Sequence, residues 1–379
     1  MLPKKSLSLF FILTSLCAFT QTVSFTYDGV LRNYIIHLPT GYNSANKYPL
    51  VFNLHGYTSN ATEQQLYSMM DVVANNEGFI VVYPNGIANY WNSGFTGVYG
   101  TGTDDVGFIS AIIDSMNANY SIDLQRVYSC GMSNGGFQSY RMACELEDRI
   151  AAVASVTGSM SDSTYFYCST SRTVPVMQIH GTTDPVVPYG GTFGMKPIED
   201  VVSFWTSSNN CSSFDTTEVS NISLTDSCTA DFIRITNCDY GTENWFYKIY
   251  NGGHTWPSGL IDIPTNGNTN RDINASQRIW DFFSMYTLSS GTSNIREIQT
   301  ETTLWPNPAA TGAFTVESEK SFDACILYAI DGRALHKEHF TPAFSKSINV
   351  AGLAHGVYVL HLINQGRILN QLKLVVQDF

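Results

Sequence analysis

The sequence predicts an α/β protein with a mainly parallel central sheet, followed by a small C-terminal β-sandwich. Up to about residue 288, short apolar segments that end in glycine alternate with helix-length segments. Beyond residue 303, short strands alternate with turns and no helix pattern follows. Apolar strands that alternate with helices indicate a parallel sheet covered on both faces. A chain of 379 residues has room for such a unit and a smaller appendage.

The composition is typical of a globular protein that is exported. Hydrophobic residues make up 44% of the chain and charged residues 14%, which excludes a disordered protein. The net charge is −12 with only 20 lysines and arginines, which argues against a nucleic-acid or acidic-membrane partner. We expect no nucleic-acid partner, and we expect a monomer.

The N-terminus predicts a secretory signal peptide over residues 1–20. Two lysines precede an apolar run at 7–19, and polar residues follow. This run is too short for a stable membrane span. Cys17 would also suit a lipoprotein signal, but Leu16 before it is bulky where a small residue is needed. We therefore expect export, to the extracellular space or the cell surface, without lipidation.

The cysteines predict disulfide bonds, because exported proteins pair most of their cysteines. Seven of the eight remain once Cys17 has left with the signal peptide. Cys211, Cys228 and Cys238 cluster in one segment, and Cys144 and Cys168 flank another, with the pairing left open. No C-x-x-C motif occurs, so a zinc or thioredoxin-like site is not predicted. The odd number leaves at least one free thiol.

The elements of the first domain follow in order along residues 21–288. Residues 24–38 alternate as two antiparallel strands around an Asp28-Gly29 turn. Further strands, rich in Val, Ile, Phe and Tyr, are expected at 49–54, 79–83, 126–130, 150–156, 174–179 and 245–250. Helices are expected at 62–77, 105–119, 134–146, 197–209 and 274–287. The last helix begins with Asn274 and Gln277 at capping-box spacing.

The remainder of the chain predicts a linker and a second domain. Residues 289–302 are polar, as a linker would be. Residues 303–379 contain short strands separated by turns, at 313–317, 324–330, 357–363 and 369–376. This pattern predicts the small β-sandwich.

Residues 131–136 (Gly-Met-Ser-Asn-Gly-Gly) contain the motif G-x-S-x-G. A predicted strand leads into the motif and a predicted helix leaves it, which is the strand–turn–helix that a nucleophile elbow requires. The turn is strained and leaves no room for Cβ atoms beside the serine, which explains the glycines at 131 and 135. The motif predicts that Ser133 is a nucleophile. The alternative is a glycine-rich turn with an unreactive serine.

A serine nucleophile needs a histidine base, and the base needs an orienting carboxylate. In such sheets the order along the chain is serine, carboxylate, histidine. Asp184 directly follows the predicted strand at 174–179. His254 is the only histidine between Asp184 and the linker, on a glycine-rich loop after the last strand. The order predicts a Ser133–Asp184–His254 triad; the alternative for His254 is a surface histidine.

The oxyanion of an acyl-transfer reaction needs two backbone N–H donors. One is expected from Asn134, directly after the nucleophile. The other is expected from Tyr57, on the loop after the strand at 49–54. We expect His55 and His180 to hold their loops by hydrogen bonds rather than to act as bases.

Three aromatic residues are candidates for substrate binding: Tyr57, Trp91 and Trp256. They lie on loops at the carboxyl ends of predicted strands, where open α/β sheets bind ligands. A packing role is the alternative for each. Asp104 and Asp105 could suggest a metal site, but no oxygen-ligand spacing surrounds them, so a charge pair at a helix N-terminus is favoured. We expect no metal and no cofactor.

An ordered set of motifs extends over residues 25–287. They are His-Gly at 55–56, Tyr-Pro-Asn-Gly at 83–86, Asp-Asp-Val-Gly-Phe-Ile at 104–109, Arg-Val-Tyr at 126–128, Gly-Met-Ser-Asn-Gly-Gly at 131–136, His-Gly-Thr-Thr-Asp-Pro-Val-Val-Pro-Tyr at 180–189 and Gly-Gly-His-Thr-Trp-Pro at 252–257. This set resembles the secreted polyhydroxybutyrate depolymerase/feruloyl esterase family of α/β-hydrolases. The resemblance implies Ser133 as nucleophile, Asp184 as acid and His254 as base. It also implies action on feruloyl and acetyl esters of plant polysaccharides, or on polyesters.

Residues 303–379 resemble the C-terminal sorting domain of the type IX secretion system. The motifs are Trp-Pro-Asn-Pro at 305–308, Asp-Gly-Arg at 331–333, Gly-Leu at 352–353 and His-Gly-Val-Tyr at 355–358. The resemblance implies passage across two membranes, with the secretion machinery as a partner. The domain would then be removed or kept as a surface anchor.

These observations together predict a secreted serine carboxylesterase that hydrolyses feruloyl or acetyl esters of plant polysaccharides. The alternative is a depolymerase of polyesters, either polyhydroxybutyrate or an aromatic polyester such as polyethylene terephthalate. A peptidase of the same fold would usually carry a propeller or cap domain, which is not recognisable here. A surface adhesin would leave the Ser–Asp–His set unexplained.

Overall fold

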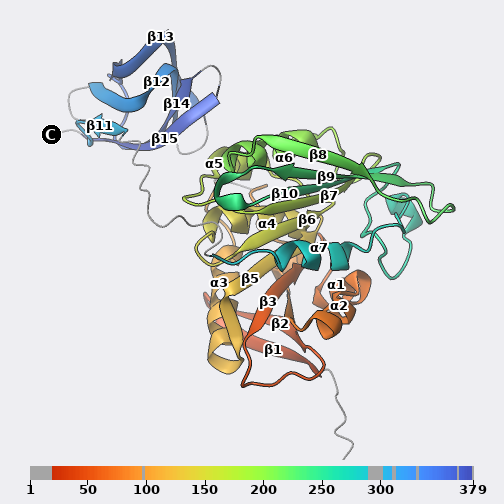
Figure 1. Cartoon of the computed structure of the whole chain (residues 1–379). Coiled ribbons are helices and arrows are strands. Elements are labelled where there is room, and N and C mark those ends of the chain that lie inside the picture. The colour runs from red at the N-terminus through yellow and green to blue at the C-terminus, as the bar shows by residue number, and fades with distance from the viewer. Residues whose placement is uncertain are drawn as a thin grey trace, which may run out of the picture.

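The computed structural model describes residues 19–95, 99–288, 302–309, 313–329, 333–364 and 367–377 (Figure 1). These residues form a ten-stranded sheet with helices and a separate five-stranded sheet. The predicted signal peptide depends on residues 1–18, which lie outside the described residues, as do 289–301 of the predicted linker. Among the described residues, none of the helices has the length and apolar character needed to cross a membrane.

The strands of the large sheet lie in the order β1-β2-β4-β3-β5-β6-β7-β10-β9-β8. Their bounds are β1 (Phe19–Tyr27), β2 (Val30–Leu38), β3 (Tyr48–Leu54), β4 (Ile80–Pro84), β5 (Ile122–Met132), β6 (Ala152–Val156), β7 (Val176–Gly181), β8 (Ser213–Glu218), β9 (Thr229–Thr236) and β10 (Asn244–Tyr250). The six central strands from β4 to β10 pair in parallel. Strands β1 and β2 on one side, and β9 and β8 on the other, are antiparallel. The mainly parallel sheet is therefore as predicted.

Helices cover both faces of this sheet (Figure 1). They are α1 (Ala61–Ser68), α2 (Met70–Glu77), α3 (Asp105–Asn119), α4 (Asn134–Glu145), α5 (Asp162–Tyr167), α6 (Ile198–Ser208) and α7 (Ala275–Phe283). Side chains of α3, α4 and α6 pack in one core with Leu50 and Phe52 of β3. Side chains of α1, α2 and α7 pack in a second core with Val51, which points to the opposite face. Strand β3 is mostly apolar because both of its faces are buried, and the buried amide of Asn53 is hydrogen-bonded to Ser68 and Gln64.

Some predicted elements differ from the structure. The predicted helix at 62–77 is two helices, because Met69 has a left-handed backbone with φ of 55° and ends α1. Strands β8 and β9 were not predicted, since their side chains are mostly polar or exposed. Helix α5 has only six residues, too few for a periodic pattern.

Two disulfide bonds join residues of the large unit. Cys144, near the end of α4, is bonded to Cys168, which follows α5. Cys211 is bonded to Cys238. Within the described residues, Cys130, Cys228 and Cys325 are free and buried. The sequence predicted paired cysteines and at least one free thiol, and both are present.

The C-terminal unit is an antiparallel sheet with its own core. Its strands are β11 (Thr303–Trp305), β12 (Ala313–Ala329), β13 (Ala334–Asn349), β14 (Gly356–Asn364) and β15 (Arg367–Val376). Register shifts between β12 and β13 bend this long hairpin, and the sheet curls around the apolar side chains of its core (Figure 1). The unit is the sandwich-like β domain that the sequence predicted.

Candidate active site

Ser133 lies at the sharp turn between β5 and α4. Its backbone has φ of 53° and ψ of −122°, a strained conformation for a residue with a side chain. A Cβ atom on Gly135 would lie 2.2 Å from the carbonyl oxygen of Leu54, and one on Gly131 would lie 2.5 Å from the carbonyl carbon of Gly135. Only glycine fits at these two positions. The predicted strand–turn–helix is present, with the serine at its tip.

Asp184 and His254 form a hydrogen-bonded pair on loops that follow β7 and β10. His254 Nδ1 donates to Asp184 Oδ2 over 2.8 Å. Asp184 Oδ1 accepts from the backbone N–H groups of Val186 and Val187, each over 2.8 Å. Both side chains of the pair are buried. The carboxylate is thus held by three donors, and it fixes the imidazole with Nδ1 protonated and Nε2 free to accept a proton.

The loop that carries His254 is fixed from its other side. The His254 N–H donates to the carbonyl of Asn266 over 2.6 Å, and Asn266 Nδ2 donates back to the His254 carbonyl over 3.2 Å. A Cβ atom on Gly253 would lie 2.1 Å from the Asn266 carbonyl oxygen. The glycine before the histidine therefore permits the close approach of the two loop segments.

Ser133, Asp184 and His254 lie at the same edge of the sheet, because they follow the carboxyl ends of β5, β7 and β10. Within the described part of the chain, Ser133 Oγ makes no hydrogen bond to His254, whereas Asp184 does. In free enzymes the bond between nucleophile and base is often long and shortens when substrate binds.

Two backbone N–H groups are available beside Ser133. A Cβ atom on Gly56 would lie 3.4 Å from Ser133 Cβ, so the loop after β3, with Tyr57, approaches the serine. Asn134 is the first residue of α4, where backbone N–H groups lack helical acceptors and the helix dipole favours negative charge. In the part of the chain described, neither the Tyr57 nor the Asn134 N–H donates to a protein oxygen. These are the donors that the sequence predicted for an oxyanion.

His55 holds the loop that approaches Ser133. Its Nδ1 donates to the Gly56 carbonyl over 2.7 Å, and its Nε2 accepts from the Gly86 N–H over 3.0 Å. This pattern is that of a neutral imidazole, and burial lowers the pKa of His55. The expectation of a loop-holding role for His55 agrees with these contacts.

His180 holds the loop of Asp184 in the same manner. Its Nε2 donates to the Val187 carbonyl over 2.9 Å, and its Nδ1 accepts from Gln178 Nε2 over 3.0 Å. Burial lowers the pKa of His180 to about 4, although Asp184 Oδ2 lies 3.5 Å from its Nε2. The neutral ring links the strand to the loop beneath the carboxylate.

Trp91 and Trp256, which the sequence offered as substrate contacts, are both buried, as the alternative of a packing role predicts. Trp91 Nε1 donates to the His55 carbonyl over 2.9 Å, and Trp256 Nε1 donates to Ser276 Oγ over 3.1 Å. Both rings pack beneath the loops and support them. The ring of Tyr57, by contrast, is 67% exposed.

Asp104 and Asp105 are occupied by protein donors. Asp104 Oδ1 accepts from the Gly107 N–H over 2.8 Å at the start of α3, as the helix N-terminal interpretation predicts. Asp105 is buried and pairs with Arg32 over 2.7 Å. Elsewhere in the described residues, one group could hold a metal ion: Cys325, His336 and Glu338 in the C-terminal sheet, where Lys346 Nζ lies 2.8 Å from Glu338.

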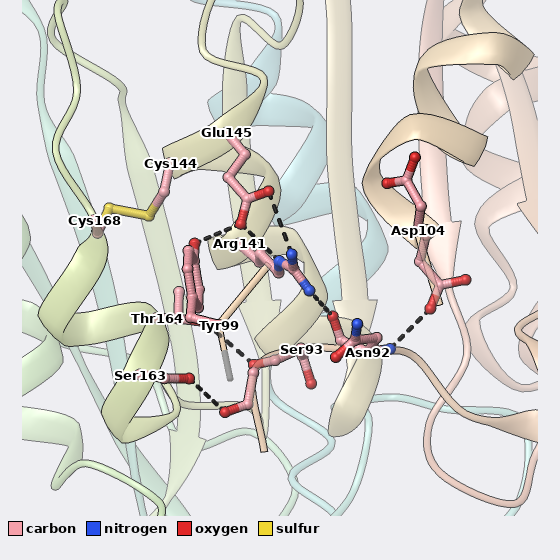
Figure 2. A network of polar contacts seen from close by, with 12 residues as sticks. Asn92, Ser93, Tyr99, Asp104, Arg141, Cys144, Glu145, Ser163, Thr164 and Cys168 are labelled. Carbon is pink, nitrogen blue, oxygen red and sulfur yellow. Dashed lines mark hydrogen bonds and ion pairs between the residues drawn. A yellow bond between two sulfur atoms is a disulfide. The ribbon is translucent and has the colours of Figure 1, made fainter. Parts of the chain in front are cut away.

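A polar network that the sequence analysis did not identify lies next to this site (Figure 2). It holds the loop after Trp91 to α4 and α5. Arg141 donates to the carbonyl of Asn92 and pairs with Glu145 over 2.7 Å, and Tyr99 donates to the same carboxylate. Asn134 Nδ2, from the residue after Ser133, donates to Ser93 Oγ over 2.8 Å. Apart from Arg141 and Glu145, which are four residues apart on α4, these residues have partners that are distant along the chain, so no spacing in the sequence marks them.

Residues 32–236, more than half of the chain, match the model of the esterase PHB depolymerase family. The chain belongs to this family. Residues 303–377 match the secretion system C-terminal sorting domain, so the chain also carries that domain.

Curated relatives agree with this membership, and a solved structure has the same fold. The chain is 30% identical over 266 residues to a bifunctional acetylxylan esterase/xylanase of Neocallimastix patriciarum. The aligned region covers 70% of this chain and 35% of that protein. It is 28% identical over 245 residues to feruloyl esterase B of Piromyces equi, covering 61% of this chain and 44% of that protein. It thus spans less than half of the length of these two relatives. An acetyl xylan esterase from Aspergillus awamori has the same fold, with a TM-score of 0.51 and 16% identity over 70% of this chain and 98% of that one.

Proposed function

We propose that this family member is an exported serine carboxylesterase in which Ser133 is the nucleophile, His254 the base and Asp184 the orienting acid. The observation that supports this most is the 2.8 Å hydrogen bond from His254 Nδ1 to Asp184, at the sheet edge where the strained Ser133 lies. A buried imidazole held by a carboxylate is the arrangement that activates a serine hydroxyl.

The chemistry follows from this placement. His254 takes the proton of Ser133 as Oγ attacks the ester carbonyl carbon, and the N–H groups of Tyr57 and Asn134 bind the resulting oxyanion. His254 then gives the proton to the leaving alcohol, and an acyl-enzyme remains. Water, deprotonated by His254, attacks the acyl group, and the acid leaves as Ser133 recovers its proton. Each step balances without a cofactor.

We rank feruloyl and acetyl esters of plant polysaccharides first as substrates. The names of the relatives support this class, since one is a feruloyl esterase and the others act on acetylxylan. Polyester hydrolysis is the second candidate, and the description of the family supports it.

We also propose how the chain is divided. Residues 1–20 are a signal peptide, 21–288 the catalytic domain, 289–302 a linker and 303–379 the sorting domain. The match of residues 303–377 to a secretion sorting domain supports export to the extracellular space or the cell surface. The secretion machinery is then a partner of the C-terminal domain.

The test is kcat/KM of the purified chain on methyl ferulate, p-nitrophenyl acetate and a soluble hydroxybutyrate oligomer. Ser133→Ala is measured alongside, with Ser220→Ala at an exposed position as the matched control. We expect Ser133→Ala to abolish turnover and Ser220→Ala to leave it unchanged. Full activity of Ser133→Ala on any ester would exclude the mechanism.

A further inference from the structure

Two large aromatic side chains, Phe95 and Phe193, are exposed to solvent near the turn of Ser133. Phe95 is 41% exposed and Phe193 is fully exposed. A single exposed apolar side chain is ordinary on a protein surface. These two are unusual because they come from loops almost a hundred residues apart and lie on adjoining segments.

Contacts with the nucleophile helix place Phe95. Its ring lies edge-on to that of Phe137, with the ring centroids 4.8 Å apart. Phe137 is in the first turn of α4, and its N–H donates to the Ser133 carbonyl over 3.0 Å. Ser93, two residues before Phe95, accepts from the side chain of Asn134. Phe95 is therefore held on the helix that begins directly after Ser133.

Phe193 lies on a tight turn that adjoins Phe95. Thr192 and Met195 exchange two backbone hydrogen bonds across this turn, of 3.1 and 2.9 Å. The Asp162 N–H donates to the Gly194 carbonyl over 3.1 Å, which joins the turn to α5. A Cβ atom on Gly194 would lie 3.8 Å from Cδ1 of Phe95. The backbone of the Phe193 turn at Gly194 thus lies against the ring of Phe95.

The loop of Phe95 is held by hydrogen bonds to its backbone (Figure 2). Ser161 and Thr164 donate to the Ser93 carbonyl over 2.8 and 3.2 Å, and Ser163 donates to the Gly94 carbonyl. A Cβ atom on Gly94, which has φ of 87°, would lie within 2.8 Å of the same three hydroxyl oxygens. These contacts fix the backbone before a ligand arrives, so little ordering is needed on binding.

We propose that Phe95 and Phe193 bind the aromatic ring of the acid part of the substrate ester, so that aryl esters are preferred to acetyl esters. The proposal rests on the esterase function proposed above. Aromatic rings attract each other in edge-on or offset contacts beyond the gain from burying their area. An acetyl group has no ring and gains nothing from such contacts. The two side chains are therefore specificity-determining residues.

The experiment compares kcat/KM of the full chain on methyl ferulate and on methyl acetate, which has no ring on either side of the ester. The variants are Phe95→Ala, Phe193→Ala and the double variant. Phe214→Ala is the matched control, because Phe214 is 77% exposed on β8. We expect the double variant to lose about tenfold on methyl ferulate, from two ring contacts, and to keep its rate on methyl acetate.

The outcomes separate the two proposals. Equal losses on both esters would indicate a merely structural role, and an unchanged rate on methyl ferulate would also overturn the inference. If the unmodified chain hydrolyses neither ester, both this proposal and the proposed esterase function fail.

Bis(2-hydroxyethyl) terephthalate, as a third substrate, distinguishes the source of the aryl ring. A faster rate on it than on methyl ferulate assigns the ring to an aromatic polyester, and a slower rate assigns it to a plant phenolic acid.

Discussion

Asp184 illustrates how the candidate site is held at the scale of single residues. One oxygen of its carboxylate accepts from two backbone N–H groups, and the other accepts from His254. The backbone bonds fix the position of the carboxylate, and its charge can stabilise the imidazolium that forms during catalysis.

Replacing Asp184 by Asn removes the charge at this position and keeps the shape. We expect Asp184→Asn to lower kcat by about 10³- to 10⁴-fold, because the imidazolium loses its counter-charge and its orientation. Steady-state kinetics on methyl ferulate measures this loss. Asp215→Asn, at an exposed position on β8, is the control and should keep full activity. A loss of less than tenfold for Asp184→Asn would contradict the role of the acid.

His180 should make the stability of the large unit depend on pH. Its pKa is about 4 in the folded protein because the ring is buried, against an ordinary value of 6.5. The unfolded chain therefore takes up the proton first as the pH falls. The stabilisation is complete above pH 6.5 and is lost between pH 6.5 and 4, by about 3 kcal/mol in the free energy of unfolding.

Urea unfolding at pH 7 and pH 4.5 measures this effect. His180→Gln removes the titrating group, and we expect its unfolding free energy to change less between the two pH values than that of the unmodified chain. His254 and Asp184 lie next to the ring and are kept in both proteins, so the two proteins differ only at residue 180. Identical pH dependence in the two proteins would contradict the prediction.

At this scale the sequence predicts the placement of the proposed triad better than that of the groups around it. The order of Ser133, Asp184 and His254 along the chain is enough to place them at one sheet edge. The burial of Trp91 and Trp256 depends on which loops fold over them, and that information lies in distant residues. The sequence also did not single out Phe95 and Phe193, because a phenylalanine in a loop belongs to no repeating pattern.

At the scale of elements, the turn between β5 and α4 depends on the absence of side chains at two glycines. We expect Gly135→Ala to abolish activity and to lower the free energy of unfolding by about 1–3 kcal/mol, because its Cβ would lie too close to the carbonyl of Leu54. Gly190→Ala is the matched control, since a Cβ atom there meets nothing within 4 Å. Activity assays and thermal unfolding measure both variants. If Gly135→Ala kept the activity and the stability of Gly190→Ala, the turn would tolerate a side chain.

The elements differ in how well the sequence predicts them. Helix α3 begins and ends at the predicted residues, because Asp104 caps its first turn. The division of the predicted helix at Met69 was missed, because nothing in the apolar pattern marks a left-handed residue. The edge strand β8 and its neighbour β9 were missed because they are less buried than the central strands and lack the apolar runs on which the prediction rested.

At the scale of the whole molecule, the described residues contain separate cores for the two sheets. Two clusters of apolar side chains lie on the faces of the ten-stranded sheet, and a third fills the C-terminal sheet. Because units with their own cores unfold cooperatively as units, we expect two transitions in scanning calorimetry of the full chain. Gly135→Ala should lower the temperature of only one of them. A single transition that moves as a whole would show that the two units unfold together.

The disulfide between Cys144 and Cys168 can form only after the protein has reached an oxidising compartment. It joins the helix that starts after Ser133 to the helix whose hydroxyl groups hold the loop of Phe95. Such bonds form in oxidising compartments and are rare in the reducing cytoplasm. The newly made chain therefore lacks this covalent link while it is inside the cell. Only after leaving the cytoplasm does the enzyme gain the bond between the helix that follows Ser133 and the segment that holds the loop of Phe95.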